Sequence, residues 1–208
     1  MKTIYMYVQD TMADWEHGYL MQVLSLQNML KEPKVSFKTV GRTKNSIRTA
    51  SGITLVPDIS LDELDVTTVA ALVLIGGDTW QEKEQADILK LASELLQQGI
   101  LVAAICGATL GLADLGLLNE RPHTSNASFF LSEMSQNYKG QDYYQEATAV
   151  RDGCLITASS AGSLLWARYI IEYLNLYSEK TVEAWFKYFS TGQVNYYGEL
   201  VASLSQED

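Results

Sequence analysis

Two uninterrupted apolar runs constrain the fold of this 208-residue chain more than any other feature. Residues 69–75 have the sequence Val-Ala-Ala-Leu-Val-Leu-Ile, and residues 100–105 have the sequence Ile-Leu-Val-Ala-Ala-Ile. This composition is typical of a parallel strand that is covered on both faces. Between the runs, residues 82–98 predict a helix that ends at Gly99, a residue type suited to a helix C-terminus. The alternation of strand, helix and strand predicts a doubly wound parallel sheet.

The remaining segments extend this alternation. Strands are predicted at 4–8 and 35–40, a helix at 14–30 capped by Asp14, a polar connection with a short hairpin ending at 53–56, a hairpin at 148–157, a helix at 160–174 and an aromatic C-terminal helix at about 179–190. The chain shows no internal repeat, low-complexity stretch or domain linker. We therefore expect one domain over residues 1–208.

Composition narrows the classes of protein and partner. Hydrophobic residues make up 47% of the chain and charged residues 19%, which favours a substantial core over disorder. The net charge of −10 repels phosphate backbones, so we expect no nucleic-acid partner. Residues 1–9 do not resemble a signal peptide, and the apolar stretch 100–118 fits a strand and a small-residue helix better than a membrane span. With only two cysteines, a cytoplasmic location without membrane association is expected.

Cys106 follows the second apolar run and precedes a predicted helix. This is the strand–turn–helix order of a nucleophile elbow, and small residues flank it at Ala104, Gly107 and Ala108. A thiol at a helix N-terminus is expected to have a lowered pKa. The backbone N–H groups of Gly107 and Gly77 are candidates for an oxyanion hole. An inert buried cysteine is the alternative from these features alone.

Four segments, in this order and spacing, resemble the ThiJ/PfpI superfamily, which is related to class I glutamine amidotransferase domains. The segments are Ala13–Glu16, Leu74–Gly77, Ala103–Ala108 and Asp152–Ser159. The resemblance covers nearly the whole chain. It implies a flavodoxin-like three-layer sandwich with a mostly parallel central sheet and a reactive cysteine on an elbow. For Cys154, inside a predicted hairpin strand, an inert role is the better interpretation.

The resemblance also implies a carboxylic acid, from the first strand–helix turn, that hydrogen-bonds the cysteine. By position this acid is Glu16, with Asp14 a weaker candidate that suits a helix cap better. Glu16 would hold the thiolate while itself protonated, so its pKa should be raised. Judged without the resemblance, Glu16 would be interpreted as a solvated carboxylate in the first turn of a helix.

The chain departs from the family peptidases, which place a histidine directly after the nucleophile, where Gly107 stands here. The histidine of other members aligns with Asn126, three residues after His123. Asn126 is a candidate to orient substrate or water, and His123 is either a base or an exposed loop residue at the entrance to a strand. The other histidine, His17, should point about 100° away from Glu16 on a helix. The sequence therefore indicates a branch without a Cys–His pair.

These features predict a cysteine-dependent hydrolase, of the amidase or glyoxalase/deglycase type, that acts on a small carbonyl or amide compound through a Cys106 thiolate. Proteolysis and glutamine amidotransfer are not expected. The alternatives are a redox or electrophile sensor in which Glu16 holds an oxidised Cys106, and a binding or structural dimer with an idle cysteine. We expect no cofactor, no metal site and a homodimer, as in family members.

Four aromatic residues are expected near the strand ends, as pocket lining or ordinary packing: Trp15, Trp80, Phe129 and Phe130.

Overall fold

A seven-stranded sheet forms the centre of the computed structural model, which describes residues 1–207. Its strand order is β5-β2-β1-β6-β7-β9-β8, and every neighbouring pair is parallel except β8 and β9. The predicted doubly wound parallel sheet is confirmed. The strands are β1 (Thr3–Tyr7), β2 (Ser36–Gly41), β5 (Ile59–Ser60), β6 (Val69–Leu74), β7 (Leu101–Ile105), β8 (Ala149–Asp152) and β9 (Leu155–Ala158).

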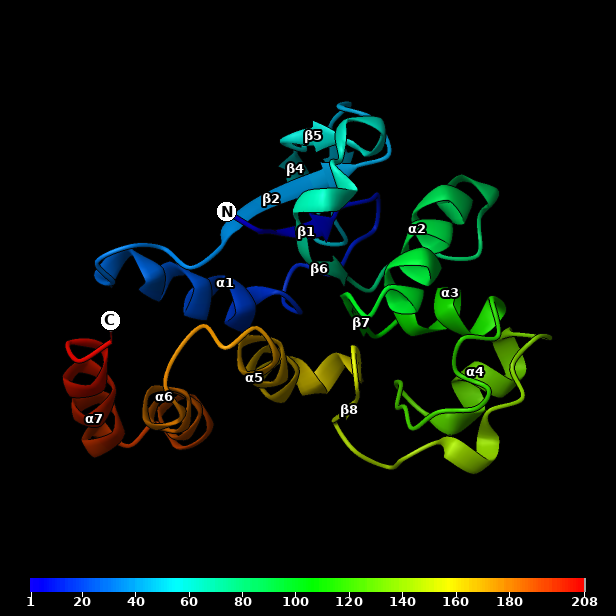
Figure 1. The fold of residues 1–208 in the computed structure, drawn as a ribbon. Coiled ribbons are helices and arrows are strands. Elements are labelled where there is room, and N and C mark those ends of the chain that lie inside the picture. Colours follow the sequence, from blue (N-terminus) through cyan, green and yellow to red (C-terminus); the bar gives the residue numbers. More distant parts are fainter. Residues whose placement is uncertain (208) are drawn as a thin grey trace.

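Helices cover both faces of the sheet (Figure 1). One face carries α1 (Gly18–Ser25), α5 (Ser163–Tyr173), α6 (Glu179–Thr191) and α7 (Val194–Leu204), and the other carries α2 (Ala86–Gln97), α3 (Ala108–Asp114) and α4 (Ser128–Met134). Short 3-10 turns occur at Leu26–Met29, Leu61–Glu63, Val66–Thr68, Lys83–Gln85, Gln141–Tyr143 and Ser160–Gly162. This arrangement is the flavodoxin-like three-layer sandwich that the resemblance implies. In the described part of the chain, no helix has the length and apolar character needed to cross a membrane.

The core is divided by the sheet into two apolar clusters. In β7, Leu101, Ala103 and Ile105 pack on the α1 and α5 side, whereas Val102 and Ala104 pack on the α2 side. Side chains of a strand alternate between the faces, so a strand covered twice must be apolar throughout. This is the reason why the two apolar runs of the sequence identify the central strands.

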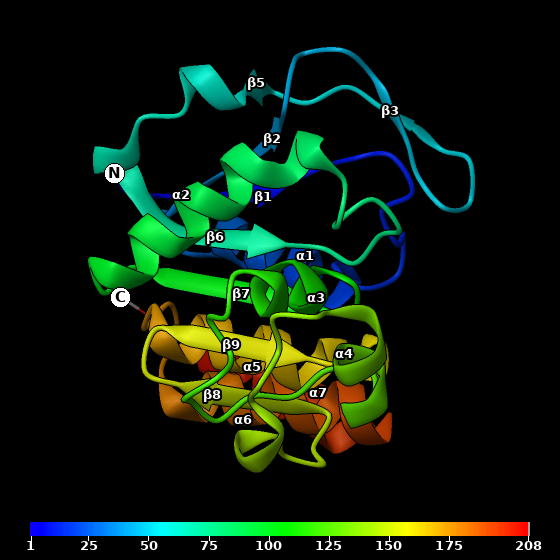
Figure 2. The same ribbon diagram turned by 90° about the vertical axis from the view of Figure 1, so that its right-hand side faces the viewer.

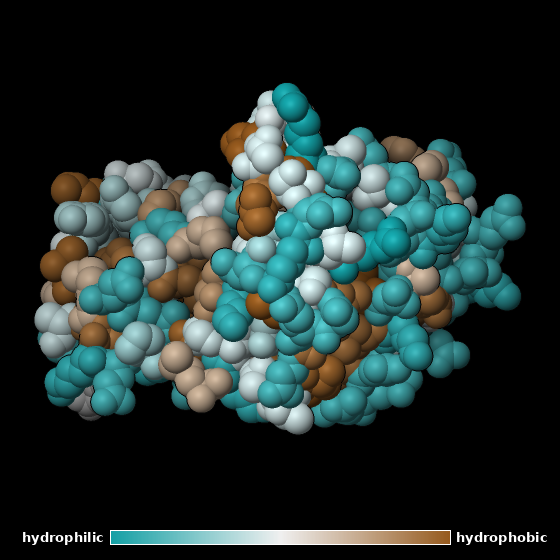
Figure 3. Space-filling model, turned by 90° about the horizontal axis from the view of Figure 1, so that it is seen from above, coloured by the Kyte–Doolittle hydropathy of each residue, from teal (hydrophilic) through white to brown (hydrophobic). Residues whose placement is uncertain are grey.

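A two-stranded arm, β3 (Ile47–Arg48) and β4 (Thr54–Leu55), projects from the carboxyl edge of the sheet (Figure 2). The predicted hairpin at this place is confirmed. The same arm stands out from the body in the view from above and carries apolar as well as polar residues (Figure 3). Ile53 and Val56, at and just beyond its end, are exposed.

The predicted helix at 14–30 is wrong in its first turn. The helix α1 begins only at Gly18, with His17 as its N-terminal boundary residue. Asp14 does not cap it, because its carboxylate accepts the N–H of Ser51 in the arm, at 2.8 Å. The preceding residues are held by tertiary bonds instead, among them the bond from the N–H of Ala13 to the carbonyl of Gly76, at 2.9 Å.

The C-terminal region contains one helix more than predicted. The aromatic helix is confirmed as α6, and Gly192, with a φ of +69°, ends it in a left-handed turn that suits glycine. Trp185 of α6 is buried against α1, where its Nε1 donates to Gln22 at 2.6 Å. After this turn α7 folds back along α6 and adds Leu200 and Leu204 to the same apolar cluster.

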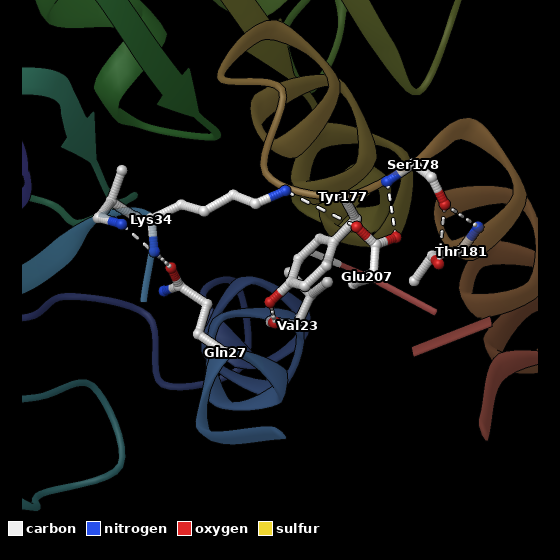
Figure 4. A network of polar contacts seen from close by, with 8 residues as sticks. Val23, Gln27, Lys34, Tyr177, Ser178, Thr181 and Glu207 are labelled. Atoms are coloured by element: carbon white, nitrogen blue, oxygen red, sulfur yellow. Dashed lines mark hydrogen bonds and ion pairs between the residues drawn. The ribbon is translucent and has the colours of Figure 1, made fainter. Parts of the chain in front are cut away.

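A buried carboxylate fixes the end of α7 to the rest of the layer (Figure 4). The Glu207 side chain is only 4% exposed and pairs with Lys34 at 3.6 Å. It also accepts the N–H of Ser178 at 2.7 Å. Burial alone would raise the pKa of Glu207, but bonds from Thr181 and Ser178 and the charge of Lys34 outweigh it, so the pKa is lowered.

We predict that Glu207→Gln destabilises the folded protein by about 1–2 kcal/mol at neutral pH, because it removes charge-assisted hydrogen bonds. A lowered folded pKa stabilises the protein above the unfolded pKa of about 4.3, and this contribution is lost as the pH falls through the folded value. Urea unfolding should therefore show a difference between variant and parent at neutral pH that shrinks in acid. Glu133→Gln, at an exposed carboxylate, is the matched control. An equal effect of both variants would contradict the prediction.

Candidate active site

Four strand ends meet at one edge of the sheet, because β1, β6, β7 and β9 are parallel. Cys106 directly follows β7 and precedes α3, which confirms the strand–turn–helix order expected of an elbow. Its φ is +56°, a left-handed conformation that costs a residue with a side chain about 1–3 kcal/mol. Neighbouring bonds hold the turn: the Cys106 N–H donates to Ala158 at 2.9 Å, and its carbonyl accepts the Thr109 hydroxyl at 2.6 Å.

Glycines are required where the turn after β6 meets the elbow. A Cβ on Gly76 would lie 2.6 Å from Glu16 Oε2 and 2.7 Å from the Cβ of Cys106. A Cβ on Gly107 would lie 2.5 Å from the carbonyl oxygen of Gly77 and 3.1 Å from its nitrogen. The structure therefore brings Gly77 and Gly107 side by side. The oxyanion-hole role of their N–H groups stays a prediction.

Glu16 is fully buried beside Cys106, although it belongs to the loop between β1 and α1. Its Oε2 accepts the N–H of Gly76 at 2.8 Å, and its Oε1 accepts the hydroxyl of Ser160 at 2.9 Å. Burial raises the pKa of Glu16, the direction that was expected, and hydrogen bonds from Cys106, Gly76 and Ser160 oppose that rise. Glu16 is therefore no solvated surface carboxylate.

The expected lowering of the Cys106 pKa is wrong. Burial, and next the negative charge of Glu16, raise the pKa of Cys106 to about 11, although Asn126 and the Gly107 N–H donate to the sulfur. The helix at the elbow spans only Ala108–Asp114, and its N-terminus does not compensate for the loss of solvent. The pKa values of both groups are therefore raised, and the hydrogen bonds from Gly76 and Ser160 favour the ionised form of Glu16.

Asn126 and Ser160 complete the surroundings of the thiol. Asn126 Nδ2 donates to Cys106 Sγ at 3.1 Å, while its Oδ1 accepts the backbone N–H of Ser160 at 2.9 Å. Ser160 therefore positions Asn126 through its backbone and Glu16 through its hydroxyl. The hydroxyl in turn accepts Nε1 of Trp15 at 3.0 Å. The sequence analysis missed the role of Ser160; the signal was its position just after β9, which neighbours β7.

Neither histidine contacts Cys106 in residues 1–207. His123 is fully buried, and its ring nitrogens lie 2.8 Å from the Tyr138 hydroxyl and 2.8 Å from the Arg121 carbonyl. The expectation of an exposed loop histidine is therefore wrong, and so is that of a strand beginning near Asn126, where α4 follows instead. Burial lowers the pKa of His123 and of His17.

One of the four expected aromatic residues contacts the site. Trp15 is 59% exposed and bonds Ser160, whereas Trp80 is buried and donates its Nε1 to Ile75 at 2.8 Å. Phe129 is 64% exposed on α4, and Phe130 packs against the core. Within residues 1–207, no cluster of three His, Cys, Asp or Glu residues could hold a metal ion.

Comparison with known proteins establishes the family. The DJ-1/PfpI family matches residues 2–173, so the chain belongs to this family. The uncharacterized protease YoaZ of Bacillus subtilis (strain 168) is 39% identical over 207 residues, 99% of each chain. The uncharacterized protease YdeA of the same strain is 31% identical over 189 residues, 88% of each chain. The crystal structure of the thiJ/pfpI family protein from Bacillus anthracis has a TM-score of 0.91 and 35% identity, and the match covers 99% of each chain. The ThiJ/PfpI resemblance is thereby confirmed.

We predict that alkylation of Cys106 by iodoacetamide increases with pH up to about 11, whereas an ordinary cysteine titrates near 8.5. Glu16→Gln removes the neighbouring negative charge, which should lower the thiol pKa and speed labelling at neutral pH about tenfold. Mass spectrometry of the Cys106 peptide measures both rates.

Asp14→Asn is the matched control, since Asp14 bonds the arm and not the site. It should leave the labelling rate of Cys106 unchanged. Slower labelling in Glu16→Gln than in the parent would contradict the prediction that the charge of Glu16 raises the pKa of the thiol.

Proposed function

We propose that the protein is a cysteine-dependent hydrolase, of the amidase or glyoxalase/deglycase type, that acts on a small carbonyl or amide compound. The observation that carries this proposal is the placement of Cys106 between a buried carboxylate, Glu16, and a hydrogen-bond donor, Asn126. Membership of the DJ-1/PfpI family supports it, as do the protease names of two relatives. Cys106 and Glu16 are the proposed catalytic residues, and Asn126 is proposed to orient substrate or water beside the thiol.

The proposed first step begins from the thiol. Sγ attacks the carbonyl carbon, the S–H proton passes to the Glu16 carboxylate, and the carbonyl electron pair moves to oxygen. A raised pKa makes Glu16 a better base for this transfer than a solvated carboxylate. The N–H groups of Gly77 and Gly107 are the proposed donors to the oxyanion. With an amide, Glu16 then gives this proton to the leaving amine as the C–N bond breaks; a water that loses a proton to Glu16 attacks the resulting thioester, and the acid and the reprotonated Cys106 thiol are released as the C–S bond breaks. With an aldehyde, Glu16 returns the proton to the oxyanion of the adduct.

Proteolysis and glutamine hydrolysis are not proposed. The residue after Cys106 is Gly107 rather than a histidine, and His123 bonds Tyr138 rather than the thiol. The alternative function is a redox or electrophile sensor in which the buried Glu16 holds an oxidised Cys106.

We also propose three further properties: a single domain, a cytoplasmic location and a homodimer. The exposed Ile53 and Val56 of the arm support self-association, because exposed apolar groups favour contact with a partner. A small-molecule substrate, with no nucleic-acid or membrane partner, fits the net charge of −10.

We predict turnover in a screen of 2-oxoaldehydes, primary amides and aryl amides that depends on Cys106. Cys106→Ser should lower the rate at least about a hundredfold, because a serine hydroxyl beside Glu16 is a far weaker nucleophile at neutral pH. Product formation, followed by absorbance or NMR, measures this. Cys154→Ser is the matched control and should retain the rate. Equal rates in parent and Cys106→Ser would refute the proposal.

Ser160 is predicted to be a positioning residue. Ser160→Ala removes the hydroxyl that bonds Glu16 and should lower kcat about tenfold while shifting the pH profile of the rate to higher pH, because Glu16 then loses a donor that lowers its pKa. Ser160→Thr keeps the hydroxyl and should restore most of the rate. A rate loss without a shift of the profile would indicate a merely structural role.

A further inference from the structure

A cavity of about 480 Å³ opens at the carboxyl ends of β1 and β2. From β1 the chain builds the sheet outward through β2 on one side and through β6 on the other. The crevice where the order reverses is the position at which open α/β sheets bind ligands. Segments from both sides of the reversal line this cavity: Gln9 after β1, Arg42 after β2, and Thr79, Glu82, Glu84 and Gln85 after β6. Figure 2 shows the β3–β4 arm and the segment before α2 at this edge.

The cavity is separate from the proposed catalytic site. Cys106, Glu16, Ser160 and Asn126 do not line it. The Gly76–Gly77 turn lies between the two, because a Cβ on Gly77 would lie 3.0 Å from Nε2 of Gln9, whereas Gly77 abuts Gly107 on its other side. Binding in the cavity therefore does not require the cysteine.

A hydrogen-bonded chain of neutral side chains forms one wall. The Tyr7 hydroxyl donates to Gln85 Oε1 at 2.8 Å, Gln85 Nε2 donates to Thr79 at 3.2 Å, and the Thr79 hydroxyl donates to Gln9 Oε1 at 3.0 Å. The chain ends at Gln9, which is 4% exposed and whose Nε2 finds no acceptor in residues 1–207. Unpaired buried donors are rare in proteins, and the residue that carries this one also lines the cavity.

Both signs of charge line the cavity without neutralising each other. In the described part of the chain, the guanidinium of Arg42 and the carboxylate of Glu82 have no ion pair or hydrogen-bond partner, and Glu84 has only Lys83, at 4.0 Å. Asp10, also in the wall, accepts the Arg48 N–H at 2.7 Å. A simple anion meets three carboxylates here, and a simple cation meets an unpaired arginine, so neither fits well.

We propose that this cavity binds a small zwitterion of the amino-acid class, with the ligand carboxylate on Arg42 and its ammonium group on Glu82 and Glu84. The guanidinium suits a carboxylate because it donates in a planar fork. The volume lies within the range of small-molecule sites. The Gln9 and Thr79 wall supplies hydrogen bonds to the amide or hydroxyl of a side chain.

Titration of the ¹⁵N-labelled protein with the common α-amino acids tests the proposal, read from the side-chain NH₂ signals of Gln9 and Gln85 and the amide of Gly77. Saturable shifts of these signals are expected with at least one amino acid and not with acetate or methylamine, which carry one charge each. Arg42→Gln should weaken binding about tenfold. Lys44→Gln, two residues away and paired with Glu63, is the matched control and should bind as the parent does.

Three results would overturn the proposal: no saturable shift with any amino acid, equal shifts with acetate or methylamine, or equal affinity in Arg42→Gln and Lys44→Gln. Binding should persist in Cys106→Ser, so the outcome does not depend on whether Cys106 is catalytic. Arg42 is exposed and unpartnered among residues 1–207, so its substitution leaves the fold intact.

Discussion

The burial of one carboxyl group, that of Glu16, organises the carboxyl edge of the sheet. Transfer of a carboxylate out of water is costly unless hydrogen bonds replace its hydration. Here the replacements come from three strand ends: the Gly76 N–H after β6, the Ser160 hydroxyl after β9 and the Cys106 thiol after β7. The loop that carries Glu16 must therefore lie against all three turns. As a result, α1 begins only at Gly18, and the loop backbone is hydrogen-bonded to Gly76.

The same burial couples the titration of Glu16 to that of Cys106. Two acidic groups in contact within a desolvated site titrate as a pair, and ionisation of one opposes that of the other. Burial and the negative charge of Glu16 raise the pKa of Cys106, and burial also raises the pKa of Glu16 against three hydrogen bonds. A histidine partner would share the thiol proton differently, because its charged form is positive and stabilises a thiolate. Asn126 occupies the donor position without being able to accept a proton from sulfur, so the proposed base is Glu16.

Sequence patterns were sufficient for the parts of the molecule that depend on local periodicity. The apolar runs at 69–75 and 100–105 located β6 and β7, and the small residues around Cys106 located the elbow. The errors fall where tertiary contacts override local preference. Asp14 is a residue type that commonly caps helices, but its carboxylate accepts a hydrogen bond from the arm. The pKa of the Cys106 thiol depends on how deeply the thiol is buried. A helix N-terminus predicted from the sequence does not show this burial. Ser160 acts through contacts with Glu16 and Asn126, which are distant from it in the chain.

The Gly76–Gly77 turn gives the edge of the sheet two different faces. On one side it touches the elbow so closely that neither Gly76 nor Gly107 can carry a side chain. On the other side it borders Gln9, the end of the hydrogen-bonded wall of the cavity at the carboxyl ends of β1 and β2. A rigid turn of two glycines can support both because it contributes only backbone groups to each. Any movement of Gln9 that accompanies ligand binding would bear directly on the backbone of Gly77, one of the two proposed oxyanion donors. The switch point of the sheet and the nucleophile elbow are thus separated by a single turn. Energetic coupling between a ligand in the cavity and the elbow would need only this turn as its path.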